Sequence, residues 1–269
     1  MNASEARYQT ADVPRADRQI RLGSFLFTMV EPHKGHEVAY NRWYERDHFY
    51  AGCMIGAYQF AGARFVATRD CKKLRYPQAS PVTQGDPMRG SYLAIYWVLD
   101  GHHDDWNVWG VDQVNWLHKN DRMFAHRDHV HTLLYKYAGE QNGPGSHTPA
   151  ELALDRMYAG IVVLIGEASA GTKPEAISKF FAERPCPADL MVAGAPLPML
   201  ANRPADVPDD KGADRFVQIY FTEKDPIAEW DRYVALARDF EHSGLGRIVF
   251  SSPFLRTVVG TDRYTDQLW

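Results

Sequence analysis

The chain has 269 residues, of which 45% are hydrophobic, and a formal net charge of −4. This length and composition suffice for one large domain or two ordinary domains with a hydrophobic core. A negative charge without a block of Lys or Arg argues against nucleic acid and anionic membrane surfaces as main partners. Three cysteines without a CxxC spacing indicate neither a disulfide framework nor a zinc site. With no apolar run long enough for a membrane helix, we expect a cytoplasmic protein without membrane partners.

The first half of the chain is predicted to run strand, helix, strand, strand, helix, strand, after a polar arm at residues 1–22. Side-chain alternation and β-favouring residues predict strands at 24–30, 57–68, 91–99 and 129–137. Apolar periodicity predicts helices at 33–56 and 104–120. Residues 70–90 are rich in Pro, Gly and charge and form a long surface excursion, either a lid over a site or a decoration.

A linker rich in Gly, Pro and Ser, residues 141–158, leads into a second half with the same predicted order. Its strands are predicted at 160–166, 191–200, 215–222 and 247–260, and its helices at 172–183 and 225–243. A shift of 137 residues places NRWY at 41–44 over SKFF at 178–181, so rings lie over rings. We therefore predict an α+β chain of two tandem ferredoxin-like βαββαβ repeats, at 23–140 and 159–269, whose free sheet faces pack together.

The first predicted helix carries ionisable side chains on its apolar face. With a period of 3.6 residues, one face contains Tyr40, Trp43, Tyr44, Asp47, His48 and Ala51. Buried phenols, a carboxylate and an imidazole each need a polar partner, whereas a purely structural helix would carry Leu, Ile and Ala. The shift of 137 residues places His48 over Pro185, so the second half has no counterpart of this imidazole. The active cavity is therefore predicted in the first half, and the second half is a degenerate repeat.

The segment from Trp43 to Phe65 resembles the helix-to-strand signature of the EthD-like branch of the dimeric α+β barrel superfamily. In that signature a WYxxxH helix is followed by a Gly and then by an Arg-aromatic strand, and the matching residues are Trp43, Tyr44, His48, Gly56, Arg64 and Phe65. The resemblance implies that the two repeats form a dimeric-α+β-barrel-type pair within one chain, with a site between sheet and helices. The superfamily includes cofactor-free monooxygenases, isomerases, cyclases and lyases acting on aromatic or polyketide-like molecules, and also haem proteins.

Four residues are candidates for catalysis. His48 is the candidate general acid or base, because imidazole titrates near neutrality and can pass a proton in either direction. Tyr44, one helical turn away, can form a hydrogen bond with His48, and Asp47 either assists or is a solvated charge. Tyr96 on the third predicted strand either faces the helices and donates to a developing oxyanion or packs in the barrel core.

Substrate binding has seven candidates, which are Trp43, Tyr40, Arg64, Trp97, Trp109, His129 and His131. The planar fork of Arg64 can orient a carboxylate or phenolate, or can pair with an acidic neighbour. His129 and His131, predicted to share one strand face, are interpreted as cavity lining or a proton relay, because no third ligand at a recognisable spacing completes a metal site. Trp106 is assigned to the core, because Trp230 lies over it at a shift of 124 residues.

Together these residues predict a cofactor-independent enzyme of the lyase or isomerase type, which transfers protons on a hydrophobic, aromatic small molecule. The first alternative is a cofactor-free monooxygenase on an aromatic or polyketide-like substrate, which begins with the same deprotonation. The others are a haem protein with His129 or His131 as axial ligand, and a ligand-binding protein without activity. No phosphate-binding loop or nucleophile elbow occurs in the sequence. Whether two chains form a homodimer stays open.

Overall fold

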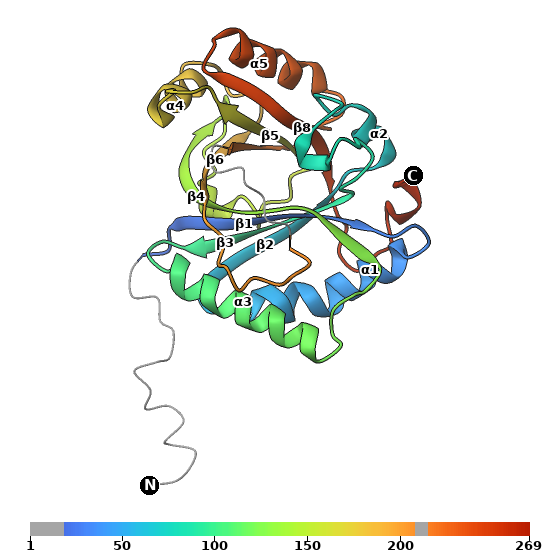
Figure 1. Cartoon of the computed structure of the whole chain (residues 1–269). Helices are drawn as coiled ribbons and strands as arrows, with labels where there is room; N and C mark the ends of the chain where they lie inside the picture. Colours follow the sequence, from blue (N-terminus) through green and yellow to red (C-terminus); the bar gives the residue numbers. More distant parts are fainter. Residues whose placement is uncertain (1–18, 208–214) are drawn as a thin grey trace.

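The structure is a computed structural model that describes residues 19–207 and 215–269. Eight antiparallel strands close into a barrel in the order β1-β3-β2-β8-β5-β7-β6-β4 (Figure 1). The strands are β1 (Leu22–Pro32), β2 (Gln59–Val66), β3 (Tyr92–Leu99), β4 (Arg127–Asn142), β5 (Gly160–Ala168), β6 (Leu190–Leu197), β7 (Arg215–Thr222) and β8 (Gly246–Arg256).

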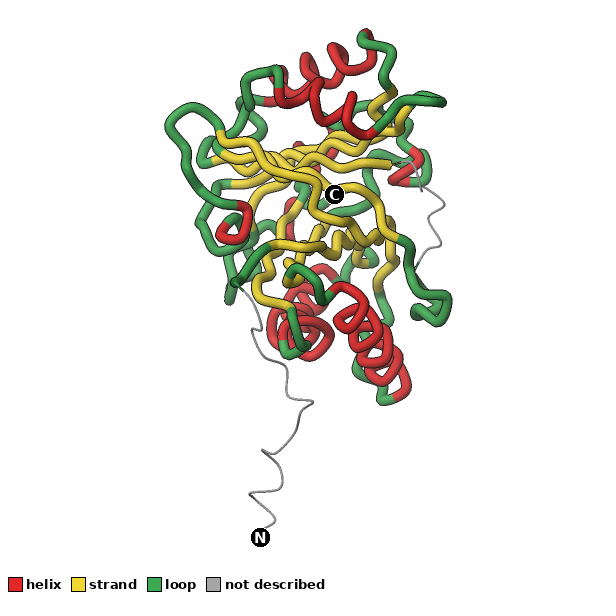
Figure 2. The backbone as a smooth tube through the Cα atoms, turned by 90° about the vertical axis from the view of Figure 1, so that its left-hand side faces the viewer, coloured by secondary structure: helices red, strands yellow, loops and turns green. Residues whose placement is uncertain are grey.

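Helices cover the barrel on two opposite sides, as the red segments above and below the yellow strands of Figure 2 show. The first half contributes α1 (Glu37–Trp43), the π-helix η2 (Tyr44–Met54) and α3 (His103–Lys119), and the second half α4 (Pro174–Ala182) and α5 (Trp230–His242). Shorter helices are α2 (Arg69–Lys73), η3 (Pro81–Thr83), η4 (Ala150–Leu152) and η5 (Thr265–Gln267). Within the described part of the chain, no helix combines the length and apolar character that a membrane span needs.

The element order agrees with the order predicted from the sequence. Strand, helix, strand, strand, helix and strand follow one another twice, and each half arranges its four strands in the same spatial order, β4-β1-β3-β2 and β8-β5-β7-β6. Helix α4 begins at Pro174, 137 residues after α1 begins at Glu37, which is the shift that aligns the two halves in sequence. The first helix therefore begins at the equivalent position in both halves of the chain. In the first half η2 continues α1, whereas in the second half α4 ends at Ala182.

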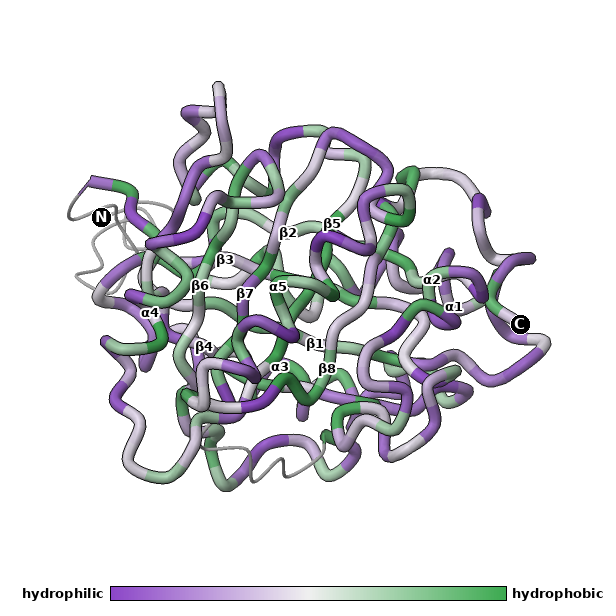
Figure 3. Tube along the Cα trace, turned by 90° about the horizontal axis from the view of Figure 1, so that it is seen from above, coloured by the Kyte–Doolittle hydropathy of each residue, from purple (hydrophilic) through white to green (hydrophobic). Residues whose placement is uncertain are grey.

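Alternation along the strands separates the barrel interior from the faces that the helices cover. On β1, Phe25, Phe27 and Met29 are fully buried inside the barrel, whereas Leu26 and Val30 pack against the helices. Each fully buried side chain of this kind stabilises the fold by roughly 1.5–3 kcal/mol. Figure 3 shows hydrophobic residues, in green, along the strands at the centre of the molecule.

The same alternation on β3 places two of the predicted site residues on opposite sides of the sheet. Tyr96 faces the helices, which is one of the two orientations that the sequence allows. Trp97 points into the barrel interior, where it is fully buried and its indole nitrogen donates to the carbonyl oxygen of Ala150 at 2.9 Å. Trp97 is thus part of the barrel core.

The two halves meet along two unequal seams. Between β4 and β6 the ladder has eight residue pairs, from Leu134↔Leu197 to Asn142↔Leu190. Between β2 and β8 it has two, Phe65↔Arg256 and Val66↔Leu255. The barrel is therefore closed firmly on one side and by a short contact on the other.

Residues 70–90 are fixed against the barrel. Arg75 is buried, and its guanidinium donates to the carbonyl oxygens of Pro87, Arg89 and Gly90. Tyr76 pairs with Ser251 of β8 in an isolated bridge. None of the residues 70–90 lines the cavity described below, so of the two predicted roles the structure favours the decoration.

Candidate active site

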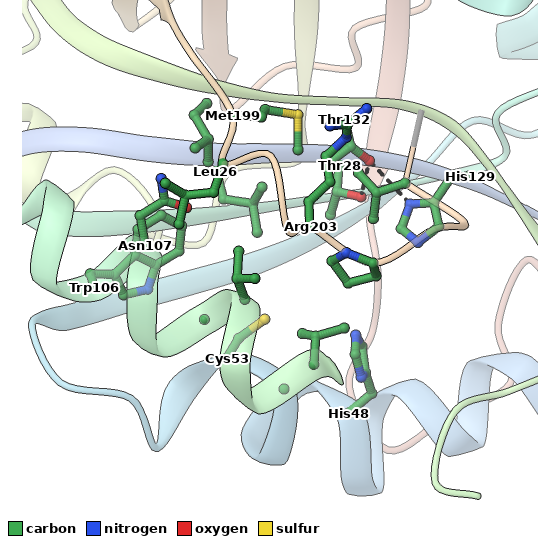
Figure 4. Close-up of a pocket in the computed structure, with 18 of the residues that line it drawn as sticks. Leu26, Thr28, His48, Cys53, Trp106, Asn107, His129, Thr132, Met199 and Arg203 are labelled. Carbon is green, nitrogen blue, oxygen red and sulfur yellow. Dashed lines mark hydrogen bonds between the residues drawn. The ribbon is translucent and has the colours of Figure 1, made fainter. Parts of the chain in front are cut away.

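A cavity of about 110 Å³ that opens to solvent lies between the sheet and the helices of the first half. Its walls come from β1, β4, η2 and α3, and from residues 199–207 of the loop that follows β6 (Figure 4). The side chains on the sheet side are Leu26, Thr28, His129, Thr132 and Leu134. Mostly apolar walls with a few polar groups are typical of sites for small molecules.

The π-helical geometry of η2 decides which of its side chains face the cavity. Hydrogen bonds in a π-helix join residues five apart, so residues four and five apart share a face. The η2 residues that line the cavity are Tyr44, His48, Gly52 and Cys53. Asp47 instead pairs with Arg122 on the outside. The prediction that Asp47 shares the face of His48 is wrong, because the chain leaves the 3.6-residue period at Tyr44.

His48 presents an uncharged imidazole to the cavity. Its ring stacks on Trp43, with centroids 4.6 Å apart, and meets the ring of Tyr44 edge-on at 5.1 Å. The Nδ1 atom is buried and has no hydrogen-bond partner among the residues that the structure describes. Burial lowers the pKa of His48 to about 3, and the charges of Arg127 and His129 act in the same direction. At neutral pH the ring is therefore a proton acceptor.

Gly52 leaves room for this imidazole. A Cβ atom at position 52 would lie 2.6 Å from Cε1 of His48, too close for the ring to stay in place. The Gly52→Ala variant is expected to displace the ring and to lower kcat/KM by up to roughly 100-fold, as steady-state kinetics would measure. Gly110→Ala is the matched control, because Gly110 lines the same cavity from α3 and an added Cβ atom meets open space. Equal losses in the two variants would contradict this role of Gly52.

Two phenols and a thiol lie next to His48. The hydroxyl oxygens of Tyr44 and Tyr96 are 2.8 Å apart and buried. Burial raises the pKa of both phenols well above the usual value, and it raises the pKa of Cys53 to about 12. All three groups therefore stay protonated at neutral pH and serve as donors rather than nucleophiles. Tyr44 lines the cavity, whereas Tyr96 does not line it and contacts the hydroxyl group of Tyr44.

A β-bulge in β4 separates the two histidines that were predicted to share a face. Met29 of β1 pairs with His131, but the next residue, Val30, pairs with His129, so β4 has one extra residue at this point. His129 lines the cavity. His131 lies on the other side, with its ring 5.9 Å from Phe27 in the barrel interior. The prediction is wrong because the bulge interrupts the two-residue alternation.

His129 is the middle of a chain of polar contacts. Its Nδ1 atom lies 3.1 Å from Oγ1 of Thr132, which lies 2.9 Å from Oγ1 of Thr28 (Figure 4). Its Nε2 atom lies 3.7 Å from the carboxylate of Asp206. Burial lowers the pKa of His129 to about 4, and Arg127 adds to the shift. Sequence reasoning missed both threonines and Asp206, because single Thr residues on strands and an Asp in a loop have no characteristic spacing.

Asp206 belongs to the loop that crosses from the second half and covers the cavity. The loop residues that line the cavity are Met199, Leu200, Arg203, Pro204 and Val207. Asp206 accepts a hydrogen bond from Arg127 at 2.9 Å and lies 3.2 Å from His118. Asn115 of α3 donates to the carbonyl oxygen of Asn202 at 3.0 Å. The cover of this cavity is thus residues 199–207, held by side chains of the first half.

Arg64 and Tyr40, two of the predicted binding residues, lie outside the cavity. Arg64 is buried, donates to Oδ1 of Asn41 at 3.0 Å and lies 3.5 Å from the carboxylate of Glu45. Its guanidinium lies 4.3 Å from the ring centroid of Tyr44 and 5.9 Å from that of Tyr40. Of the two predicted roles of Arg64, the structure shows the one in which it pairs with an acidic neighbour and braces α1 and η2.

Trp106 supplies the indole of the cavity wall. It lines the cavity and donates from its indole nitrogen to Oε1 of Gln59 at 2.8 Å. Trp97 lies in the barrel, as described above, and Trp109 packs against Gly56, where an added Cβ atom would lie 2.2 Å from the Trp109 ring. The comparison of the two halves assigned Trp106 to the core, and it is indeed buried, but one side of it faces the cavity.

The two histidines considered as haem ligands do not fit that role. Nδ1 of His129 contacts Thr132 and Nε2 lies 3.7 Å from the carboxylate of Asp206, and His131 points into the packed barrel interior. Across residues 19–207 and 215–269, no three His, Cys, Asp or Glu side chains converge as a metal site would require.

Buried uncharged imidazoles make the stability of the protein depend on pH. The pKa values of His48 and His129 lie below the ordinary value of 6.5 in the folded chain. The contribution of the two uncharged imidazoles to the free energy of unfolding is complete above pH 6.5. It is lost as the pH falls toward 4 and 3, because the unfolded chain then binds protons that the folded chain does not. We expect the free energy of unfolding, measured with urea, to fall by up to about 1.4 kcal/mol per pH unit for each histidine. His129→Gln should make the decline less steep, and an unchanged slope would contradict the assignment.

The sequence matches no known family profile and no curated protein. Among solved structures it matches a candidate chlorite dismutase at 11% identity, with 93% of this chain and 100% of that chain covered and a TM-score of 0.52. It also matches an anthrone oxidase-like protein at 6% identity, with coverage of 90% and 95% and a TM-score of 0.51. The chain therefore shares the overall fold of these two proteins. This α+β barrel is closed by the two halves of one chain, and identities this low establish the fold alone.

Proposed function

We propose that the chain is an enzyme that removes a proton from a hydrophobic, aromatic small molecule bound in the cavity beside His48. The observation that carries the proposal is the buried Nδ1 atom of His48, which lacks a hydrogen-bond partner among the described residues at the wall of a largely apolar cavity. An unsatisfied buried polar group costs about 1–3 kcal/mol. A substrate that brings a proton to this atom removes that cost.

His48 acts as the base and Tyr44 as the hydrogen-bond donor. The substrate proton passes to Nδ1 of His48, and the negative charge left on the substrate accepts a hydrogen bond from Tyr44, which Tyr96 holds in place. The low pKa of His48 makes it a weak base in the empty cavity. Negative charge that develops on the substrate raises this pKa in the complex, and the exclusion of water strengthens both interactions.

The anion formed in this way has two outcomes. When it takes the proton back at another atom, or expels a leaving group, the enzyme is an isomerase or a lyase that needs no organic cofactor. A cofactor-free monooxygenase, in which the anion reduces molecular oxygen, is the second candidate, and the fold shared with an anthrone oxidase-like protein favours it.

The architecture supports an unequal pair of repeats. We interpret the two halves as tandem ferredoxin-like repeats, because they share element order, strand order and the 137-residue shift. The first repeat carries the WYxxxH helix, on which the EthD-like assignment rests, and the second supplies the covering loop. In the described part of the second half, α4 ends at Ala182, which corresponds to Glu45, so most of η2 has no helical counterpart.

Turnover in D2O with and without oxygen tests the proposal. A panel of hydroxylated and alkylated aromatic compounds is first screened for binding, and the compounds that bind are incubated with the protein. An isomerase works without oxygen and incorporates deuterium at carbon when the anion is reprotonated, and a lyase works without oxygen and releases a leaving group, whereas a monooxygenase consumes oxygen in proportion to product. Compounds that bind but undergo neither reaction nor exchange would contradict an enzyme and favour a binding protein.

A further inference from the structure

We propose that Thr28, Thr132, His129 and Asp206 form a proton relay that ionises the hydroxyl group of a phenol or enol bound in the cavity. The relay rests on the proposed function for the location of the substrate. It adds a second acid/base group, on the wall opposite η2, and it restricts the substrate class to molecules with an acidic hydroxyl group.

The direction of the relay follows from the carboxylate at its outer end. Partial burial acts to raise the pKa of Asp206, but His129 and Arg127 hold it below the usual value, so the group is ionised. A carboxylate only accepts hydrogen bonds, and its charge favours the His129 tautomer with the proton on Nε2, 3.7 Å away. Nδ1 of His129 then carries a lone pair, and the hydroxyl group of Thr132 has to donate to it.

The remaining contacts are oriented by the same reasoning. Thr132 has one hydroxyl proton, which His129 accepts, so the 2.9 Å contact between the threonines is a donation from Thr28 to Thr132. The single hydroxyl proton of Thr28 is thus also committed. Thr28 lines the cavity and can offer only lone pairs to a ligand, so a ligand hydroxyl group at this position has to act as the donor.

The proton moves along this chain without any change in oxidation state. The O–H bond of the ligand breaks as Thr28 gains a proton, Thr28 passes its own proton to Thr132, and Thr132 passes its own to Nδ1 of His129. The products are a phenolate or enolate in the cavity and an imidazolium facing Asp206. Arg203 lines the cavity beside the two threonines (Figure 4), so a cation lies near the anion that forms.

The charged and titratable groups around His129 come from four elements. They are Arg127 and Asp128 of β4, His118 of α3, Asp206 and Arg203 of the covering loop, and His48 of η2. Arg127 opposes a proton on His129 and Asp206 favours it. The imidazolium is therefore stable only once negative charge has appeared on the ligand, which couples the relay to binding. His48 remains available to accept a proton from a carbon atom of the substrate.

A chromogenic phenol tests the relay directly, because 4-nitrophenol absorbs at longer wavelength when it is ionised. At a pH where the compound is largely neutral in water, we expect it to show the phenolate spectrum when bound to the wild-type protein. Thr132→Val keeps the shape of the side chain but removes the hydroxyl group, and should lower the bound phenolate fraction at least ten-fold. Thr132→Ser restores the hydroxyl group and should restore the spectrum. His48→Gln should leave the spectrum in place.

The outcomes separate the relay from the proposed function. The relay would be overturned by a phenolate spectrum that survives Thr132→Val, by 4-nitrophenol that binds in its neutral form, or by the absence of binding. Loss of the phenolate in His48→Gln but not in Thr132→Val would assign the ionisation to His48 instead. A relay that behaves as expected in a protein without turnover would contradict only the proposed function. Circular dichroism and the Tm of Thr132→Val establish that the variant is folded.

Discussion

The His48→Gln variant is expected to lose roughly 10²–10⁴-fold in kcat, with little change in its affinity for an aromatic ligand. Gln has a polar side chain of similar reach, but it does not accept a proton at neutral pH, so the substrate keeps its proton on carbon. Because the pKa of His48 is about 3, kcat/KM of the wild type should stay level as the pH falls through the ordinary histidine range to about pH 5. Steady-state kinetics over this pH range provides the measurement.

Asp47→Asn is the matched control for this variant. Asp47 is the sequence neighbour of His48 on the same helix, but it pairs with Arg122 outside the cavity, so its neutralisation should leave kcat unchanged. A His48→Gln enzyme with wild-type turnover would remove His48 from the mechanism. A large loss in Asp47→Asn would mean that the wall of the cavity, rather than the base, limits the rate.

The Arg64→Met variant is expected to lower the free energy of unfolding by about 3–5 kcal/mol, the usual cost of removing one partner of a buried ion pair. In this variant Asn41 loses its hydrogen-bond donor, Glu45 loses its ion-pair partner, and the guanidinium no longer lies over Tyr44. Met preserves most of the volume, so the loss reports the charge and hydrogen bonds. Denaturation with urea, followed by circular dichroism, measures the effect.

Arg42→Met provides the comparison, because Arg42 lies on α1, one of the two helices that Arg64 contacts from β2. Arg42 pairs with Asp262 at the surface, where solvent screens the charges, and its replacement should leave the denaturation midpoint almost unchanged. If both variants behaved alike, Arg64 would not brace α1 and η2. If Arg64→Met kept its stability but lost affinity for aromatic ligands, the sequence-based expectation that Arg64 binds substrate would regain support.

The strands were the most predictable part of the molecule, because their alternation is recorded directly in the sequence. The orientation of β1 and β3 follows from residues such as Phe25 and Phe27, which have to be buried together. The duplicated element order followed for the same reason. His48 stands out in the sequence as an imidazole on an apolar helical face without a counterpart in the second half, and the structure places it in the cavity wall.

Three features of the site were not predictable from periodicity. Because η2 is a π-helix, Cys53 lines the cavity and Asp47 does not. The bulge in β4 places His131 on the opposite side of the sheet from His129. The π-helix and the bulge each depend on a local insertion in the backbone, which the hydrophobic pattern of the sequence does not reveal. The loop that carries Asp206 reaches the site from the other half of the chain, and only tertiary structure brings these segments together.

The short seam between β2 and β8 has a consequence for how the protein opens. The seam between β2 and β8 has two residue pairs, whereas the seam between β4 and β6 has eight. Local fluctuations start where few backbone bonds have to break, so amide hydrogens at the β2–β8 seam should exchange with water before those at the β4–β6 seam. The β2–β8 seam adjoins Arg64, which pairs with Glu45 of η2. The covering loop, in contrast, follows β6 at the longer seam. We therefore expect the cavity wall that carries His48 to open more readily than strands β1 and β4, which carry the threonines.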